Sequence, residues 1–250
     1  MRSANVMRVG RWCVVSARFE ELDWSETPMG VISLRRRKEP SLNVDVYEVK
    51  LGDEFLMSSL FTAAEVALAR IGLAQAVDGD LDVVVGGLGL GYTAQTAIED
   101  PRVHSLVVVE ALEEVIGWHQ RRLLPDTTEL ASDPRVRLQE GDFFAMADSE
   151  AGFDPQTPGR RFHAVLLDID HTPRHVLHPS HSAFYTPAGL EKLAGHLHPG
   201  GVFALWSDDP PDAEFEAVLA EVFGESEASV IRFPNPLTGG YSTNTVYVAR

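Results

Sequence analysis

Apolar positions from residue 81 onward follow two alternating periods. Short, fully apolar runs typical of strands alternate with stretches in which apolar residues recur at helical spacing. The expected strands are 81–86, 105–110, 135–139, 162–168 and 201–206, and the expected helices are 91–99, 111–123, 187–197 and 212–224. Apolar strands in such an alternation predict a parallel sheet with helices on both faces.

The end of the chain departs from this alternation. The runs 228–233 and 243–248 are joined by a segment, 234–240, that is too short to hold a crossover helix. These two strands must therefore pair antiparallel.

The first part of the chain has a different pattern. Its strand-like runs, separated by turn-forming residues, are 12–17, 30–34, 44–50 and 54–57. They predict a small antiparallel sheet, with Arg35–Lys38 in a solvated loop or in contact with a phosphate or a partner. A helix is expected over 62–76, with Thr62 as its N-cap. The predicted organisation is a β-hairpin domain over 1–60, a linker helix over 61–79 and a larger domain over 80–250.

Composition narrows the possible functions. The chain has 250 residues, 44% of them hydrophobic, with a net charge of −16 and a single cysteine, Cys13. The acidic charge argues against nucleic-acid binding, which needs a basic surface. One cysteine fits a reducing compartment, and no apolar run approaches the ~20 residues of a membrane span. We therefore expect a cytoplasmic protein that binds neither nucleic acid nor membrane.

A glycine-rich turn follows the first strand of the larger domain. Gly86, Gly87, Gly89 and Gly91 lead into the expected helix, and Glu110 ends the next strand. Such a turn places bare backbone N–H groups beside a ligand, and the acid is positioned to accept hydrogen bonds from a ribose. The pair predicts a nucleoside cofactor site.

The glycines alone do not identify the cofactor. Gly87-x-Gly89-x-Gly91 suits methyltransferase-type sites, and Gly89-x-Gly91-x-x-Ala94 also fits the dinucleotide fingerprint. Asp142 and Phe143 follow the third strand, where an acceptor and an aromatic ring suit a purine, and Asp168 brings another acid to the same edge. The terminal hairpin is foreign to the dinucleotide sheet and argues against a dehydrogenase.

Several segments together resemble the spermidine synthase family of S-adenosylmethionine-dependent transferases, which have the methyltransferase fold. The matching segments, in chain order, are Thr27–Gly30, Leu51–Glu54, Val84–Gly91, Val109–Glu110, Asp133–Val136, Gly141–Asp142, Leu167–Asp168, Phe184–Tyr185 and Pro199–Phe203.

The resemblance implies a fold and a set of roles. The fold class is α/β, a Rossmann-like methyltransferase fold whose mostly parallel seven-stranded sheet ends in an antiparallel C-terminal hairpin, preceded by a small N-terminal antiparallel β domain. The glycine backbone would hold the aminoacyl part of the cofactor. Glu110 would bind the ribose, Asp142 the adenine amino group, and Asp168 would lie beside the sulfonium and the nucleophile. The resemblance also implies a homodimer.

The chain departs from the family pattern in its acceptor half. Gly89 stands where the family's Gly-Gly-Gly-Asp-Gly loop has aspartate, and His171 stands where Asp-Ser-Ser-Asp-Pro has its second aspartate. The family's Tyr-His-Glu reads Ala63-Ala64-Glu65, and its C-terminal tryptophan segment is replaced by 239–243. A polyamine needs several acids, and too few remain at the family's positions.

Four histidines follow the strand that ends at Asp168, namely His171, His175, His178 and His181. Three interpretations of these histidines are open. One of them acts as a general base, or together with Asp170 they bind a metal, or they lie in a solvated loop without chemistry. Pro173 and Pro179 oppose the regular helix that a metal site needs, so no metal is predicted. We predict Asp168, Asp170 and His171 as the catalytic residues.

Three functions follow from these observations. The first is methyl transfer from S-adenosylmethionine to a small-molecule acceptor. The second is aminopropyl transfer from decarboxylated S-adenosylmethionine to a polyamine, and the third is a homologue that binds the nucleoside without catalysis. The missing aspartate at Gly89 favours the first.

Overall fold

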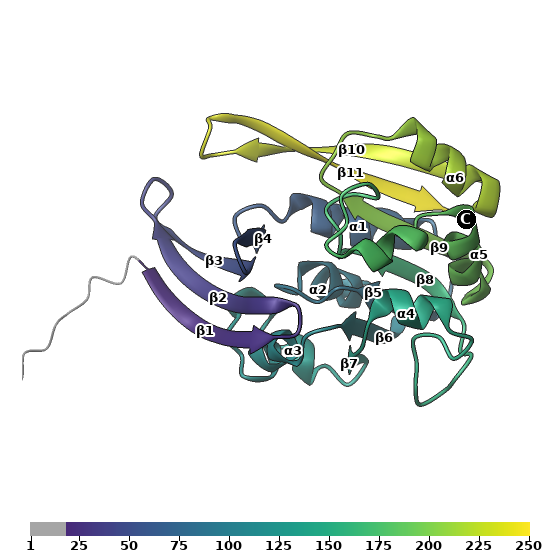
Figure 1. Ribbon diagram of the computed structural model, residues 1–250, viewed down its shortest axis with the longest axis horizontal. Coiled ribbons are helices and arrows are strands. Elements are labelled where there is room, and N and C mark those ends of the chain that lie inside the picture. The colour runs from purple at the N-terminus through teal and green to yellow at the C-terminus, as the bar shows by residue number, and fades with distance from the viewer. Residues whose placement is uncertain (1–18) are drawn as a thin grey trace, which may run out of the picture.

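The computed structural model describes residues 19–250, which form two sheets (Figure 1). The expected strand 12–17 lies outside these residues. The smaller sheet has the order β1-β2-β3-β4, and all its neighbours are antiparallel. Its strands are β1 (Phe19–Thr27), β2 (Gly30–Glu39), β3 (Val44–Leu51) and β4 (Glu54–Ser58).

The basic run Arg35–Lys38 is part of strand β2, so the expected loop is wrong. Acids on the neighbouring strands neutralise it, because Arg35 and Arg37 both pair with the buried Glu48 at 2.9 and 2.7 Å. Arg36 pairs with Glu20 across the β1–β2 ladder. The run therefore holds the small sheet together through cross-strand ion pairs.

The larger sheet has the order β10-β11-β9-β8-β5-β6-β7. From β9 to β7 the neighbours are parallel, and β11 pairs antiparallel with both β9 and β10, as the sequence predicts. Its strands are β5 (Leu81–Gly86), β6 (Val103–Glu110), β7 (Val136–Glu140), β8 (Phe162–Leu167), β9 (Leu197–Ser207), β10 (Ser226–Asn235) and β11 (Gly240–Ala249).

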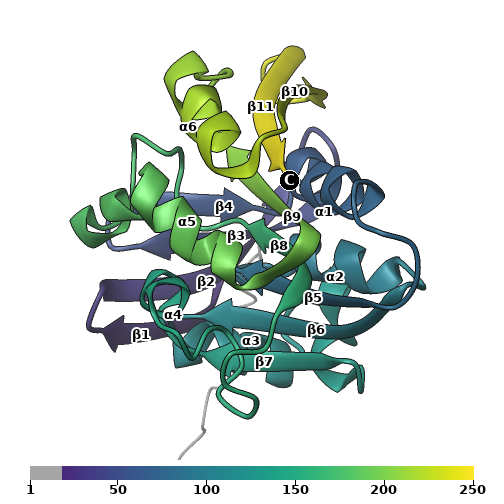
Figure 2. The same cartoon turned by 90° about the vertical axis from the view of Figure 1, so that its right-hand side faces the viewer.

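Helices cover both faces of this sheet, with α1 and α2 on one side and α4, α5 and α6 on the other (Figure 2). Alternate residues of each strand point to opposite faces, so Val83 and Val85 join one buried cluster and Val84 joins the other. The helices are α1 (Ala63–Ala74), α2 (Tyr92–Glu99), α3 (Glu113–Gln120), α4 (Phe143–Asp148), α5 (Pro187–Gly195) and α6 (Ala213–Phe223). Three short 3-10 helices span Pro125–Thr127, Leu130–Ser132 and Pro179–Ala183.

The fold class predicted from the sequence is therefore confirmed. The pattern missed strand β1, which is mostly exposed and polar, and helix α4, which has only six residues. Strand β9 begins four residues earlier than expected, at Leu197. Within residues 19–250, none of the helices is both long and apolar enough to cross a membrane.

The small sheet packs onto the larger unit and shares its core. Ile32, Leu34 and Val49 belong to the same buried cluster as Leu68 of α1. At the edge of the sheet, Asp23 of β1 accepts a hydrogen bond of 2.7 Å from Nε1 of the fully buried Trp118 in α3. These contacts hold the small sheet over the carboxyl ends of the parallel strands.

We predict that Asp23→Ala lowers the free energy of unfolding by about 1–3 kcal/mol, because it leaves the buried Trp118 N–H without an acceptor. Chemical denaturation measures this loss. In a Trp118→Phe background the same change should cost clearly less, because the donor is already gone. An equal loss in both backgrounds would show that this hydrogen bond does not hold the sheet in place.

Candidate active site

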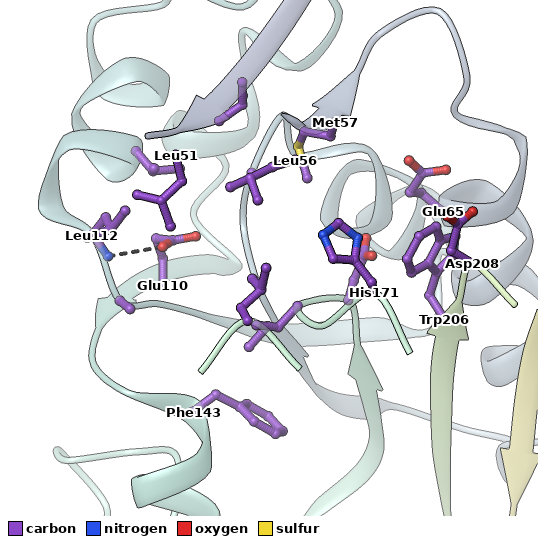
Figure 3. A pocket seen from close by; sticks show the side chains of 18 of the residues that line it. Leu51, Leu56, Met57, Glu65, Glu110, Leu112, Phe143, His171, Trp206 and Asp208 are labelled. Carbon is purple, nitrogen blue, oxygen red and sulfur yellow. Dashed lines mark hydrogen bonds between the residues drawn. The ribbon is translucent and has the colours of Figure 1, made fainter. Parts of the chain in front are cut away.

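A cavity of about 750 Å³ opens at the carboxyl ends of β5, β6 and β8. The strand order reverses here, since β6 and β7 extend from one side of β5 while β8 and β9 extend from the other. Ligands of open α/β sheets bind at such a switch point. Figure 3 shows Glu110 and Leu112 at one end of the cavity and Glu65, Trp206 and Asp208 at the other.

The glycine turn lines the cavity, but its amides are already occupied. The N–H of Gly87 donates to Val109 O, that of Leu88 to Glu110 Oε2, and that of Gly91 to Leu88 O. The bare N–H groups expected from the sequence are therefore absent at these positions. A pyrophosphate needs such donors, so the turn does not suit a dinucleotide.

Glu110 is fixed by backbone donors on both oxygens. Leu88 N donates to Oε2 at 3.0 Å, and Leu112 N donates to Oε1 at 3.0 Å, the bond drawn in Figure 3. Burial raises the pKa of Glu110, while these N–H groups oppose the increase. Each carboxylate oxygen can accept a further hydrogen bond, so the predicted role toward a ribose fits this geometry.

Asp142 and Phe143 both line the cavity, as predicted from their position after β7. Asp142 is the N-cap of α4, and its Oδ1 accepts from the N–H groups of Phe144 and Ala145. Its Oδ2 has no hydrogen-bond partner within residues 19–250. The cap fixes the carboxylate and leaves one oxygen for a ligand.

Asp168 lies at the end of β8 and meets an acid from a distant segment, Glu65 in the first turn of α1. Burial raises the pKa of Glu65 to about 8, and the charge of Asp168 adds to the effect. Burial also raises the pKa of Asp168 to about 6. A hydrogen bond of 2.7 Å that its Oδ2 accepts from Thr93 opposes this increase. The two carboxyl groups therefore share one poorly solvated space.

Asp208, which sequence reasoning missed, adds a third acid at this end of the cavity. It follows β9, and its Oδ1 accepts a hydrogen bond of 2.7 Å from Asn244 of β11. Trp206 of β9 and Phe233 of β10 line the same end. A carboxylate after the last parallel strand was a detectable signal, but it stands among several surface acids in 208–216.

His171 also lines the cavity, and a residue from the small sheet holds its ring. The distance from His171 Nε2 to Glu54 Oε1 of β4 is 2.9 Å. Glu54 lies 117 positions away in the sequence, so no local pattern could reveal this partner. Because a carboxylate accepts, Nε2 carries the proton and Nδ1 of a neutral ring keeps its lone pair.

Three of the predicted site residues do not line the cavity, namely Gly86, Gly91 and Asp170. A side chain at Gly86 would meet Phe143 at 2.6 Å, and one at Gly91 would meet His119 at 2.6 Å, so both glycines allow close packing behind the site. Asp170, predicted to be catalytic, is buried and hydrogen-bonded inside the protein, so the structure does not bring it to the cavity. Within the described residues, no group of three or more His, Cys, Asp or Glu side chains is arranged to hold a metal ion.

Charge is the most distinctive property of the cavity. Five acidic side chains line it and, among residues 19–250, no lysine or arginine does. The five acids are Glu65, Glu110, Asp142, Asp168 and Asp208. Such a cavity favours a cationic ligand.

We predict that Gly87→Ala abolishes nucleoside binding, because its Cβ would lie 2.2 Å from the backbone oxygen of Asp168. Gly79→Ala is the matched control, since Gly79 also has a positive φ but nothing within 4 Å. The control should lose about 1 kcal/mol of stability and keep its binding, both measured by denaturation and calorimetry. Unchanged binding in Gly87→Ala would contradict the assignment of this turn.

No model of a protein family matches the chain, and no curated protein sequence is similar to it. Among solved structures, the chain is similar to a spermidine synthase in complex with the transition-state analogue AdoDATO, with 16% identity and a TM-score of 0.67 over 92% of this chain and 71% of that chain. It is also similar to spermidine synthase from Thermotoga maritima, with 15% identity and a TM-score of 0.68 over 92% of this chain and 72% of that chain. The chain therefore has the spermidine synthase fold.

Proposed function

We propose that the protein transfers an aminopropyl group from decarboxylated S-adenosylmethionine to an amine acceptor. The acid-lined cavity, to which residues 19–250 contribute no lysine or arginine, is the observation that carries this proposal. The fold shared with spermidine synthases, one of which binds a transition-state analogue, agrees with it.

The cavity distinguishes the two candidate donors by one functional group. S-adenosylmethionine has a carboxylate, which would enter a cavity lined by five acids, where the described part of the chain offers no lysine or arginine to pair with it. A buried charge without a partner is costly. The decarboxylated donor has only positive charges in its alkyl chain, and these match the lining.

This reverses the ranking that the sequence favours. The sequence favours methyl transfer because Gly89 replaces the family's aspartate. In the structure Met57 occupies the space of that side chain, since a Cβ at Gly89 would lie 2.5 Å from Met57 Sδ. Three other segments supply acidic side chains to the cavity, namely Glu65, Asp168 and Asp208. The acids are therefore present, at positions that a comparison of motifs does not connect.

The sulfonium of the donor supplies an electrophilic carbon and a neutral thioether as leaving group. The protein's part is to align the amine in line with that carbon, to exclude water and to remove a proton. The lone pair on Nδ1 of His171 suits proton removal, and Glu54 orients the ring through Nε2. Asp168, with its pKa of about 6, is mostly ionised at neutral pH and favours positive charge at the donor and the amine.

The predicted homodimer and the predicted cytoplasmic location remain part of this proposal. Dimers with twofold symmetry are the commonest assembly among soluble oligomers. A monomeric mass in solution would refute the dimer.

We expect 5′-methylthioadenosine to accumulate when the protein is incubated with decarboxylated S-adenosylmethionine and a panel of diamines and monoamines. Chromatography separates this product from S-adenosylhomocysteine. Formation of S-adenosylhomocysteine when S-adenosylmethionine replaces the decarboxylated donor, with a methylated acceptor as the second product, would establish methyl transfer instead. Binding of nucleosides without turnover on any amine would favour the non-catalytic homologue.

We predict that the free energy of unfolding decreases between about pH 5 and pH 8. Folded Glu65 keeps its proton up to a pKa of about 8, whereas the unfolded side chain loses it near 4.5, so rising pH favours the unfolded state. One proton changes stability by at most about 1.4 kcal/mol per pH unit. Glu65→Gln should flatten this decrease, and the exposed Glu191→Gln should not. An unchanged slope in Glu65→Gln would show that Glu65 is not held in its neutral form.

A further inference from the structure

A buried hydrogen-bonded group lies beside the purine end of the cavity and has no part in the mechanism above. Asp170 Oδ1 accepts from Leu177 N at 2.7 Å and from His181 Nδ1 at 2.9 Å, and its Oδ2 accepts from Tyr185 Oη at 2.8 Å. All three side chains of this group are buried, with Asp170 only 1% exposed. Both carboxylate oxygens are used, so Asp170 acts through its neighbours.

The contact with Asp170 fixes the tautomer of His181. A carboxylate accepts hydrogen bonds, so the proton of the neutral imidazole stands on Nδ1 and Nε2 keeps its lone pair. Within residues 19–250, Nε2 has no hydrogen-bond partner, and His181 lines the cavity. The ring therefore presents an oriented acceptor to a ligand.

His181 stands close to the residue predicted to read adenine. Its ring stacks on Phe144 with centroids 3.9 Å apart, and the backbone N–H of Phe144 donates to Asp142 Oδ1 at 2.9 Å. Asp142, Phe144 and Ser180 also line a second hollow that adjoins the cavity, which places the segment before His181 beside Asp142. Asp142 Oδ2 and His181 Nε2 are thus two acceptors at one end of the cavity.

We propose that His181, oriented by Asp170, is a specificity-determining residue that selects a 6-aminopurine nucleoside together with Asp142. An exocyclic amino group has two N–H donors, one for each acceptor. A 6-oxo base presents an acceptor to both of them and leaves them without hydrogen bonds. The inference rests on the proposed function, because it assumes that a nucleoside occupies this cavity.

The test compares two ligands and three proteins by calorimetry. The ligands are 5′-methylthioadenosine and 5′-methylthioinosine, which differ at position 6 of the base. The proteins are the wild type, His181→Phe, which keeps a ring against Phe144, and His175→Gln, an exposed histidine of the same loop that does not line the cavity. The wild type should prefer the adenosine compound by at least about tenfold.

His181→Phe should reduce this preference at least about fivefold, and His175→Gln should leave it unchanged. An equal loss of affinity for both ligands in His181→Phe would overturn the proposal and leave His181 as a packing residue. If the wild type binds neither ligand, the proposed function fails as well, so the two failures are distinguishable.

Imidazole ¹⁵N spectra of the wild type provide a second readout, because they report directly which ring nitrogen carries the proton. They should show His181 protonated on Nδ1, with an unprotonated Nε2 whose resonance moves when 5′-methylthioadenosine is added. The His181→Gln spectrum assigns the signals. A protonated Nε2, or a resonance that does not respond to the ligand, would contradict the proposal.

Discussion

The structure depends on gathering acidic side chains at one edge of a parallel sheet, where no lysine or arginine of residues 19–250 joins them. Each acid needs some compensation for its loss of water. Backbone N–H groups compensate Glu110, Thr93 compensates Asp168 and Asn244 compensates Asp208. Glu65 has no such side-chain partner among the described residues, so its loss of water is not compensated and its pKa is raised. A cationic ligand beside Glu65 would supply this compensation and lower its pKa.

The neighbouring residues Asp170 and His171 show how one loop serves both ends of the cavity. Asp170 points into the protein and orients His181, while His171 points into the cavity and is held by Glu54. Each pairing joins an acid to a histidine, and Asp170 and His171 are not paired with each other. The small sheet takes part directly, because Glu54 belongs to β4.

The sequence predicts those features that arise from local patterns. Apolar strands such as Leu81–Gly86 and the glycines after them are visible as runs, so the sheet, its helices and the position of Glu110 and Asp142 follow. Strand β1 is not visible, because its residues are mostly exposed and polar and its place in the sheet comes from pairing with β2.

The missing parts of the site arise from contacts between distant segments. Asp168 and Glu65 approach each other only because α1 packs over the sheet, and Glu54 reaches His171 across 117 positions. The occupied amides of the glycine turn are equally hidden, because their acceptors lie on another strand and in the turn itself. A comparison of motifs therefore underestimates the number of acids that line the cavity.

The most direct measurement is the affinity of the protein for S-adenosylmethionine and for its decarboxylated form, determined by calorimetry in one buffer. The two ligands differ by a single carboxylate, so the comparison isolates the charge of the cavity. The account predicts that the decarboxylated form binds at least about tenfold more tightly, since an unpaired buried charge costs more than 1.4 kcal/mol. Equal or tighter binding of S-adenosylmethionine would contradict it.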